Sequence, residues 1–142
     1  MAKTYEVNES TRRIARLMSW MARLGMGRTQ ILTTKGRKSG TPRDVPVSPI
    51  ELDGVEYVVS PYGIRAWVLN VRADPSVTLR HGSKLREVKL EEVTGPTSAP
   101  IVAAYHARES YARKYMDVPE NPSQDDFADG FERFPVFTVK AR

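Results

Sequence analysis

Four cationic side chains lie within nine residues of the sequence, at Lys35, Arg37, Lys38 and Arg43. Gly36 and Gly40 stand among them, and glycine allows a turn whose backbone comes close to a ligand. Arginine binds a phosphate or a carboxylate through two parallel hydrogen bonds, and lysine adds a point charge. With Ser39, Thr41 and backbone N–H groups as further donors, the segment predicts an oxyanion-binding turn. A solvated surface turn of the same composition is the alternative.

Other residues that carry chemistry are sparse. The sequence has no cysteine, which excludes a disulfide framework and a thiolate nucleophile. Its two histidines, His81 and His106, are isolated, so we expect neither a metal site nor a Ser/Cys–His triad. The basic segment is not a nucleotide P-loop, because Ile31 stands where that motif has its first glycine. If the protein is an enzyme, an organic cofactor supplies the chemistry.

Aromatic residues form two groups. Tyr62 and Trp67 flank the end of a predicted strand, and Tyr105, Tyr111 and Tyr115 fall in a predicted helix. Tyr111 and Tyr115 are four residues apart and share one helical face. Such residues either pack in a core or form the walls of a pocket for a planar aromatic ligand, with phenol groups left for hydrogen bonds.

The elements that position these residues are mainly strands. We predict strands at residues 29–34, 45–52, 55–60, 77–80, 85–93 and 134–140. Pro46 and Pro49 place the second strand at a sheet edge or a bulge. Asp53 and Gly54 form a hairpin turn. The pattern indicates a mainly β fold, a small barrel of about six antiparallel strands with flanking helices.

Two helices are predicted after residue 60. A short helix over residues 65–72 has Trp67 and Asn70 on one side. A longer helix, capped by Thr97 or Ser98, runs to about residue 116 before the last strand. Residues 117–130 are polar and contain proline, and we expect a loop or a lid there.

Residues 10–26 predict an N-terminal amphipathic helix, with an apolar stripe at Ile14, Leu17, Met18 and Met21. Ser10 or Thr11 is the expected cap, and Gly25 and Gly27 end the helix. Arginines border the stripe, and Trp20 lies near its edge. The helix either covers a core or lies on an anionic membrane surface.

The charge is unevenly distributed. Residues 1–43 hold ten Lys or Arg against Glu6 and Glu9, while the rest of the chain is slightly acidic. A basic front half implies an anionic partner: nucleic acid, lipid headgroups or a phosphorylated small molecule. The stretch between Gly27 and Pro49 has no aromatic residue, which argues against single-stranded nucleic acid. A signal peptide or a membrane span of roughly 20 apolar residues is not predicted.

The order of motifs resembles a known family. ILTTKGRKSGTPRDVPV, an Asp-Gly hairpin and VVSPYGIRAWVLNVRADPSVTLRHG follow one another between about Thr29 and Val93. This order is similar to the deazaflavin (coenzyme F420)-dependent nitroreductase family of actinobacteria, within the FMN-binding-like split β-barrel superfamily. The resemblance implies a single split-barrel domain over 1–142, with an N-terminal helix (1–28), a cofactor-binding barrel core (29–93) and a helix, loop and last strand (97–142).

The resemblance also implies a reaction and a site. Reduced F420 would give a hydride to a quinone, a nitroaromatic or an activated enone, with FMN as the alternative cofactor. The implied cofactor-binding residues are Arg37, Lys38, Ser39, Arg43, Pro46, Val47, Ser60, Pro61, Tyr62, Gly63, Trp67 and Asn70. The expected catalytic residues, which face the acceptor, are Tyr115, Tyr111, Tyr105 and Ser48.

Two other functions stay open. The chain is a non-catalytic carrier of F420 or a flavin, or it is a basic module that binds a membrane surface or nucleic acid. For the reductase we expect a small-molecule electron acceptor, a monomer or a homodimer, and a cytoplasmic location. Residues 10–26 would provide a peripheral contact with the inner face of the membrane.

Overall fold

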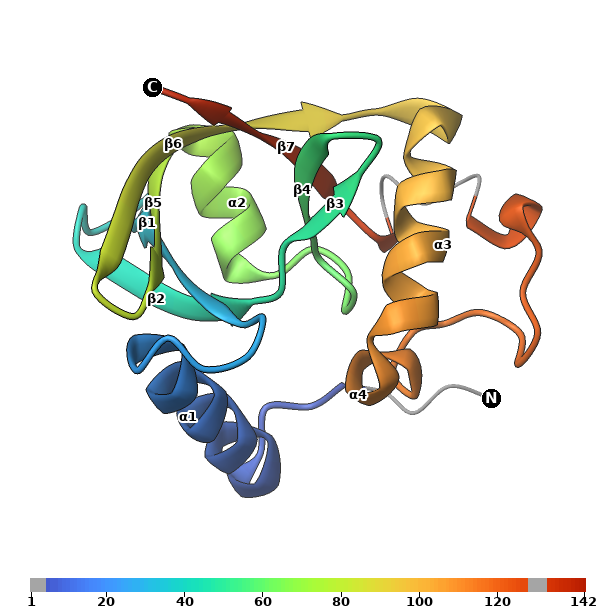
Figure 1. The fold of residues 1–142 in the computed structure, drawn as a ribbon, viewed down its shortest axis with the longest axis horizontal. Coiled ribbons are helices and arrows are strands. Elements are labelled where there is room, and N and C mark those ends of the chain that lie inside the picture. Colours follow the sequence, from blue (N-terminus) through green and yellow to red (C-terminus); the bar gives the residue numbers. More distant parts are fainter. Residues whose placement is uncertain (1–4, 128–132) are drawn as a thin grey trace.

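The computed structural model describes residues 5–127 and 133–142, which form one antiparallel sheet with helices around it (Figure 1). Within these residues the sheet has seven strands, β1 (Gln30–Lys35), β2 (Pro42–Val47), β3 (Ile50–Leu52), β4 (Val55–Val59), β5 (Ser76–His81), β6 (Lys84–Val93) and β7 (Val136–Ala141). The helices are α1 (Glu9–Arg23), α2 (Ala66–Ala73), α3 (Ala99–Arg108) and α4 (Ser110–Arg113), with 3-10 turns η1 (Gly95–Ser98) and η2 (Gln124–Phe127).

The strand order makes the sheet curl into a split barrel. Neighbouring strands follow the order β2-β1-β5-β6-β7-β4-β3, so β2 and β3 lie at opposite edges. Only Ser48 and Pro49 join these two edges in the chain, and the three residue steps from Val47 to Ile50 span at most about 11 Å. The edges must therefore meet here, as the predicted split barrel requires. There are seven strands rather than about six because the predicted strand 45–52 divides at Pro49, which has no N–H for a ladder.

The short helix α2 fills the inside of the curl (Figure 1). Its residues Trp67, Val68 and Val71 are buried against the sheet, and the ring centroids of Trp67 and Phe137 lie 5.6 Å apart. Asn70, one turn after Trp67, is also buried. The prediction that Trp67 and Asn70 share one side of this helix is confirmed. A second apolar cluster packs α3 against β4, β7 and η2.

Helix α1 packs through most of the predicted stripe, since Ile14, Met18 and Met21 are partly buried, but Leu17 lies outside the packed face. Leu17 is 55% exposed, while Ala22 is fully buried. The cap is Asn8 rather than Ser10 or Thr11: the Asn8 side chain accepts the Thr11 N–H, and the Thr11 hydroxyl accepts the Asn8 N–H. No helix in the described part of the chain is long and apolar enough to cross a membrane.

The predicted helix 97–116 is divided into three pieces. Residues 95–98 form η1, and Ser98 is the N-cap residue of α3, as predicted, but its side chain makes no capping hydrogen bond because its hydroxyl donates backwards to the Gly95 carbonyl. Helix α3 ends at Arg108, and Glu109 leaves the helical conformation with φ −98° and ψ 90°. Of the predicted loop or lid 117–130, residues 128–130 lie outside the described residues, and residues 117–127 do not line the pocket described below.

Candidate functional site

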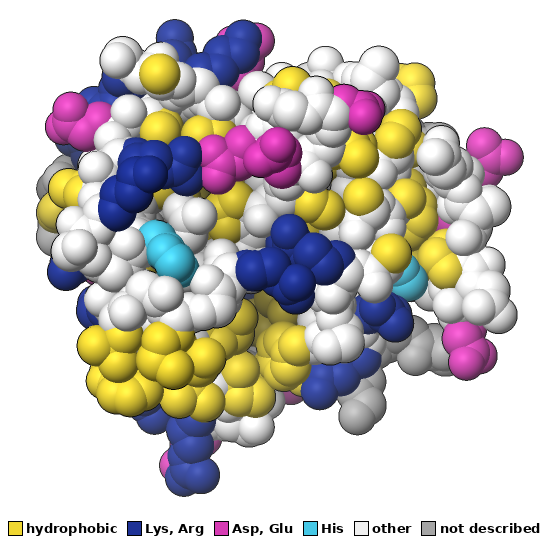
Figure 2. Space-filling view, viewed as in Figure 1, with side chains coloured by type: hydrophobic (Ala, Val, Ile, Leu, Met, Phe, Trp, Pro, Cys, Tyr) yellow, Lys and Arg dark blue, Asp and Glu magenta, His cyan; other side chains and the backbone are white. Residues whose placement is uncertain are grey.

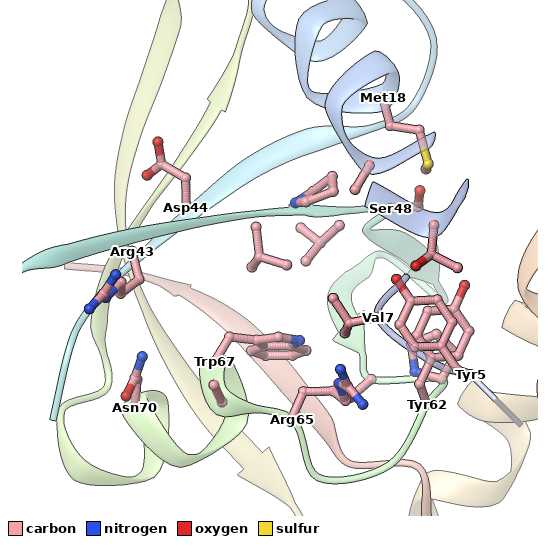
Figure 3. A pocket seen from close by; sticks show the side chains of 18 of the residues that line it. Tyr5, Val7, Met18, Arg43, Asp44, Ser48, Tyr62, Arg65, Trp67 and Asn70 are labelled. Atoms are coloured by element: carbon pink, nitrogen blue, oxygen red, sulfur yellow. The ribbon is translucent and has the colours of Figure 1, made fainter. Parts of the chain in front are cut away.

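A pocket of about 640 Å³ lies between α1, the β1–β2 hairpin and the start of α2 (Figure 3). Arg43 and Asn70 stand at one end of it, Trp67 lies between, and Tyr5 and Tyr62 stand at the other end (Figure 3). The pocket therefore joins the basic hairpin to the tyrosine group, which are far apart in the sequence.

Most of the residues predicted for the site line this one pocket. They are Arg37, Lys38, Ser39, Arg43, Pro46, Val47, Ser48, Ser60, Pro61, Tyr62, Trp67, Asn70, Tyr105 and Tyr111. Gly63 and Tyr115 do not line it. Gly63 shapes the loop instead, because its carbonyl accepts the Ser60 hydroxyl at 2.6 Å and its φ is +88°. Tyr115 packs behind Tyr62, with ring centroids 5.7 Å apart and nearly perpendicular planes.

The basic turn between β1 and β2 is tightly wound. The Gly36 N–H donates to the Thr41 carbonyl and the Gly40 N–H donates to the Gly36 carbonyl, both at 2.8 Å. A Cβ on Gly36 would stand 2.9 Å from both the Ser39 hydroxyl and the Thr41 carbonyl, so only glycine fits there without a shift. Gly40 has a φ of +73°, which glycine adopts freely. The two glycines therefore set the shape of the turn that presents the cations.

Asn70 fastens this turn to α2. Its side-chain oxygen accepts the Arg37 backbone N–H at 3.2 Å and the Arg37 guanidinium at 2.9 Å. Its amide nitrogen donates to the Thr34 hydroxyl at 3.1 Å, and both Asn70 and Thr34 are buried. The Asn70 amide thus holds Arg37 and the turn in place through three hydrogen bonds.

The cations at this end keep their charge available. Among the described residues, no carboxylate pairs with Lys38 or Arg43. The nearby Asp44 accepts the Thr33 hydroxyl at 2.6 Å and pairs with Arg23 at 3.5 Å. An anionic group entering this end meets positive charge that the protein has not neutralised.

The middle of the pocket is apolar. Pro46 and Val47 from β2 and Trp67 from α2 lie on one side, and Ile14 and Met18 from α1 contribute from another. Helix α1 therefore covers the pocket as well as the sheet. A planar ring bound here would be removed from water on several sides.

The far end is a cluster of phenols. The Tyr5 and Tyr62 rings stack with centroids 3.9 Å apart and planes 6° apart, and Tyr115 meets the Tyr5 ring edge-on at 5.4 Å. The Arg65 guanidinium lies over the Tyr5 ring, 5.2 Å from its centroid. Tyr111 contacts Tyr115, with ring centroids 5.5 Å apart.

Burial raises the pKa of three tyrosines that line the pocket, Tyr62, Tyr105 and Tyr111. It raises the pKa of Tyr62 and of Tyr105 well above the ordinary value for tyrosine. Burial, reinforced by the neighbouring Tyr115, raises the pKa of Tyr111 to about 12. The Tyr111 hydroxyl is buried, and no hydrogen-bond partner for it is found among the described residues. The Tyr115 side chain is the neighbour that interacts with this hydroxyl, and that interaction adds to the raised pKa.

Ser48 is placed by the connection between the two sheet edges. The Arg108 guanidinium donates to the carbonyls of Ser48 and Pro49 at 3.0 and 3.1 Å, and it also bonds the Glu109 carboxylate. Helix α3 thereby fixes the position of Ser48 at the phenol end. The Ser48 hydroxyl lies 3.5 Å from the Thr29 hydroxyl.

The histidines lie apart from the pocket. His81 contacts the Gly27 carbonyl at 2.9 Å, and His106 packs against Phe127 with ring centroids 5.6 Å apart. Burial, with a smaller effect from Arg113, lowers the pKa of His106. Within residues 5–127 and 133–142, no group of three or more His, Asp or Glu side chains is arranged to hold a metal ion.

Comparison with known proteins identifies the family. A family model described as F420H(2)-dependent quinone reductase matches residues 6–122. The chain belongs to this family. Its cofactor is coenzyme F420, and the resemblance noted in the sequence is confirmed.

Three solved structures are similar to this chain in fold. An F420-H2-dependent reductase is 26% identical, with 80% of this chain and 94% of the other covered and a TM-score of 0.55. An F420 reductase at 14% identity covers 86% of this chain and 92% of its own, with a TM-score of 0.54. A domain-swapped dimer at 24% identity covers 93% of this chain and 95% of its own, with a TM-score of 0.53. The last two show the fold alone. The comparison with curated proteins finds no match.

Several pocket residues of this quinone reductase family member were not predicted from the sequence. Tyr5 and Arg65 line the pocket, as do Ile14 and Met18 of α1. The apolar stripe of residues 10–26 was the available signal for α1, but it does not say what the helix covers. Tyr5 and Arg65 carried no signal, because their contact depends on the N-terminal segment returning to the start of α2.

Proposed function

We propose that this chain transfers a hydride from reduced F420 to a quinone, and also to nitroaromatic and activated-enone acceptors. The observation that carries the proposal is a single pocket with unpaired cations at one end and buried, protonated phenols at the other. This arrangement suits a long anionic cofactor with a planar ring, next to an acceptor that gains negative charge.

The residues present fit the cofactor. Its phosphate and oligoglutamate tail are anionic, and Arg37, Lys38 and Arg43, with Ser39, are the groups that would hold them. Arg37 is oriented for this task by Asn70. Pro46, Val47 and Trp67 offer apolar surface for the deazaflavin ring, and the loop from Ser60 to Gly63 frames it.

When bound, reduced F420 supplies a hydride from its C5 carbon. The chain's own residues then have three tasks: to hold the two rings in contact, to exclude water and to stabilise the reduced acceptor. A quinone that accepts a hydride becomes a hydroquinone anion, and one proton completes the hydroquinone. Tyr105, Tyr111 and Ser48 line the same pocket and are the proposed donors of hydrogen bonds to that oxygen. We propose the buried Tyr111 hydroxyl as the foremost donor of a hydrogen bond to that oxygen; because its pKa is raised, the proton itself comes from solvent. Tyr115 is proposed to support Tyr62 and Tyr111 through ring contacts.

The test is a titration of the purified protein with oxidised F420 and, separately, with FMN, at two salt concentrations. We expect F420 to bind, more weakly at high salt, and FMN to bind far less well, because FMN has no oligoglutamate tail. Turnover of menadione with reduced F420 then separates a reductase from a carrier. Binding of F420 without reduction of menadione, nitroaromatic or enone would establish the carrier. Light scattering on the same sample separates monomer from homodimer.

A second proposal concerns the outer face of α1. Leu17, Trp20 and Leu24 are each more than half exposed, and Met26 extends the same patch. Figure 2 shows hydrophobic side chains gathered over α1 at the lower left, with Lys or Arg below them. An exposed apolar face bordered by arginines suits the surface of an anionic bilayer. We propose a cytoplasmic protein with this peripheral contact at the inner face of the membrane.

Sedimentation with vesicles tests this contact. The protein should sediment with vesicles that contain phosphatidylglycerol and stay in solution with phosphatidylcholine alone. Trp20→Ser combined with Leu17→Ser should abolish the sedimentation. Val55→Ser is the matched control, because Val55 is 38% exposed in the β3–β4 hairpin, at the other edge of the sheet. Equal sedimentation of the Trp20/Leu17 variant and wild type would exclude the contact.

A further inference from the structure

Tyr5 occupies a slot shaped for an aromatic ring. Tyr62 covers one face of the Tyr5 ring at a centroid distance of 3.9 Å, and the planes are within 6° of parallel. Tyr115 closes an edge at 5.4 Å, and the Arg65 guanidinium lies over the ring at 5.2 Å. Figure 3 shows Tyr5 and Tyr62 superposed at the end of the pocket, with Arg65 reaching toward them. The surroundings of Tyr5 are therefore those of a bound planar ligand.

Tyr5 itself is weakly held. It precedes α1, whose first residue is Glu9, and the intervening Val7 is 55% exposed. Among the described residues no hydrogen bond fixes the Tyr5 hydroxyl, so ring contacts hold this side chain in the slot, while the backbone after it is tied to α1, where the Glu6 carbonyl accepts the Thr11 hydroxyl at 2.8 Å. By contrast Tyr62 belongs to the loop after β4, where the Ser60 N–H donates to the Pro135 carbonyl at 2.8 Å. The walls of the slot are anchored in the barrel, and its occupant is not.

The chemistry of the slot suits a quinone. The electron-rich face of a phenol stacks well on an electron-poor ring. The guanidinium of Arg65 attracts negative charge, and a quinone acquires negative charge when it takes up a hydride. The stacking wall thus suits the electron-poor oxidised ring, and the Arg65 charge stabilises the negative charge that the ring gains as it takes up the hydride.

We propose that this slot is the binding site for the acceptor ring, that it takes one six-membered ring of a planar quinone, and that Tyr5 is an internal plug which the acceptor displaces. This inference rests on the proposed quinone reductase function. Each acceptor molecule competes with Tyr5, so the plug lowers the apparent affinity by the fraction of molecules in which the slot is open. It also keeps the phenol end of the pocket closed to water and to weakly stacking compounds.

The plug is tested by the binding of menadione to the full chain without cofactor. Binding is measured as quenching of tryptophan fluorescence. Tyr5→Ala should bind menadione about tenfold more tightly than wild type, which corresponds to a plug closed in about nine molecules of ten. Glu6→Ala is the control, since Glu6 is next to Tyr5 in the same segment, its side chain is exposed and it does not line the pocket; the affinity of this variant should stay within about twofold of wild type. Unchanged or weaker binding by Tyr5→Ala overturns the plug.

A second variant tests the slot independently of the plug. Adding Tyr62→Ala to Tyr5→Ala removes the stacking wall and should reverse the gain in menadione affinity, while circular dichroism confirms folding. If the double variant binds menadione as tightly as Tyr5→Ala, the acceptor lies elsewhere and the proposal is wrong. These measurements need no turnover, so failure of wild type to oxidise reduced F420 would count against the proposed function and not against the slot.

Discussion

The side-chain oxygen of Asn70 accepts two hydrogen bonds from Arg37, one from its backbone N–H and one from its guanidinium. One amide thus fixes both the path of the basic turn and the direction of a cation within it. Because the Asn70 amide nitrogen donates to Thr34, the arrangement also joins β1 to α2. A buried polar network of this kind holds a binding group in place before the ligand arrives.

Replacing Asn70 should therefore affect stability and cofactor binding together. Asn70→Ala leaves the Thr34 hydroxyl buried without its donor and should lower the free energy of unfolding by about 1–3 kcal/mol, measured by urea denaturation. It should also weaken F420 binding, because Arg37 loses its orientation. Asn70→Asp keeps an acceptor for Arg37 but adds a neutralising charge, and should weaken F420 binding further. Wild-type affinity in Asn70→Ala would show that the amide does not position Arg37.

The unpaired cations should each contribute to the affinity for F420. Lys38→Ala and Arg43→Ala are each expected to cost about 1–3 kcal/mol of binding, as for loss of a charge-assisted hydrogen bond, measured by fluorescence titration. Lys35→Ala is the matched control, because Lys35 is exposed on the same hairpin and does not line the pocket. A loss in Lys35→Ala as large as in the other two would mean that the hairpin acts through its total charge.

Tyr111 offers a prediction of opposite signs for stability and turnover. Tyr111→Phe removes a buried hydroxyl that makes no close hydrogen bond among the described residues, so at pH 7 the free energy of unfolding should stay equal or rise by about 1 kcal/mol. Menadione turnover should fall if this hydroxyl serves the acceptor. An equal loss of stability and turnover would instead assign Tyr111 a structural role.

The raised pKa of Tyr111 also predicts a pH dependence. Its pKa is about 12 in the folded chain and 10.0 without the fold. The unfolded state therefore loses this proton first, and stability present below pH 10 declines as the pH rises toward 12. Tyr62 and Tyr105 act in the same direction. Unfolding free energies between pH 9 and about pH 11.5 should fall less steeply in Tyr111→Phe than in wild type.

Arg108 should determine how rigidly Ser48 is held. Arg108→Ala removes charge-assisted bonds to the Ser48 and Pro49 carbonyls and should destabilise the chain by about 1.5–3 kcal/mol. Arg108→Lys retains the charge but cannot donate to both carbonyls as the planar guanidinium does. The stability of this variant should therefore lie between those of wild type and Arg108→Ala. Thermal unfolding of the three proteins gives this order. If Arg108→Lys and wild type unfold alike, charge alone is sufficient at this position.

The fold was largely predictable because local signals dominate it. The Asp53-Gly54 turn has the positive φ angles, 52° and 79°, that this dipeptide favours, and Pro46 lies on an edge strand as its missing N–H requires. The division of residues 97–116 was not predictable from periodicity alone. Apolar spacing continues through Glu109, and the break depends on how α3 packs against β4 and η2.

The site was predictable where neighbouring residues form it and not where distant residues meet. The basic turn is one continuous segment, so its cations were identified together. The bond from Asn70 to Arg37 joins residues 33 positions apart, and the Tyr5 ring stacks on that of Tyr62, 57 positions further along the sequence. Leu17 was assigned to the packed face because its spacing fits, but the rotation of α1 is set by its contact with the sheet, where Ala22 is fully buried.

The contact between the C-terminal end of α1 and the sheet affects the position of the whole helix. The Gly82 N–H donates to the Ala22 carbonyl at 2.7 Å, and a Cβ on Gly82 would stand only 3.1 Å from the Gly25 Cα. One end of α1 is therefore fixed at the β5–β6 turn, while its other end, about 22 Å away along the helix axis, covers the pocket. A small rotation at this glycine crossing moves the far end of the helix by a much larger distance. The β5–β6 turn, which contributes no residue to the pocket, thereby helps to determine where α1 lies over the pocket.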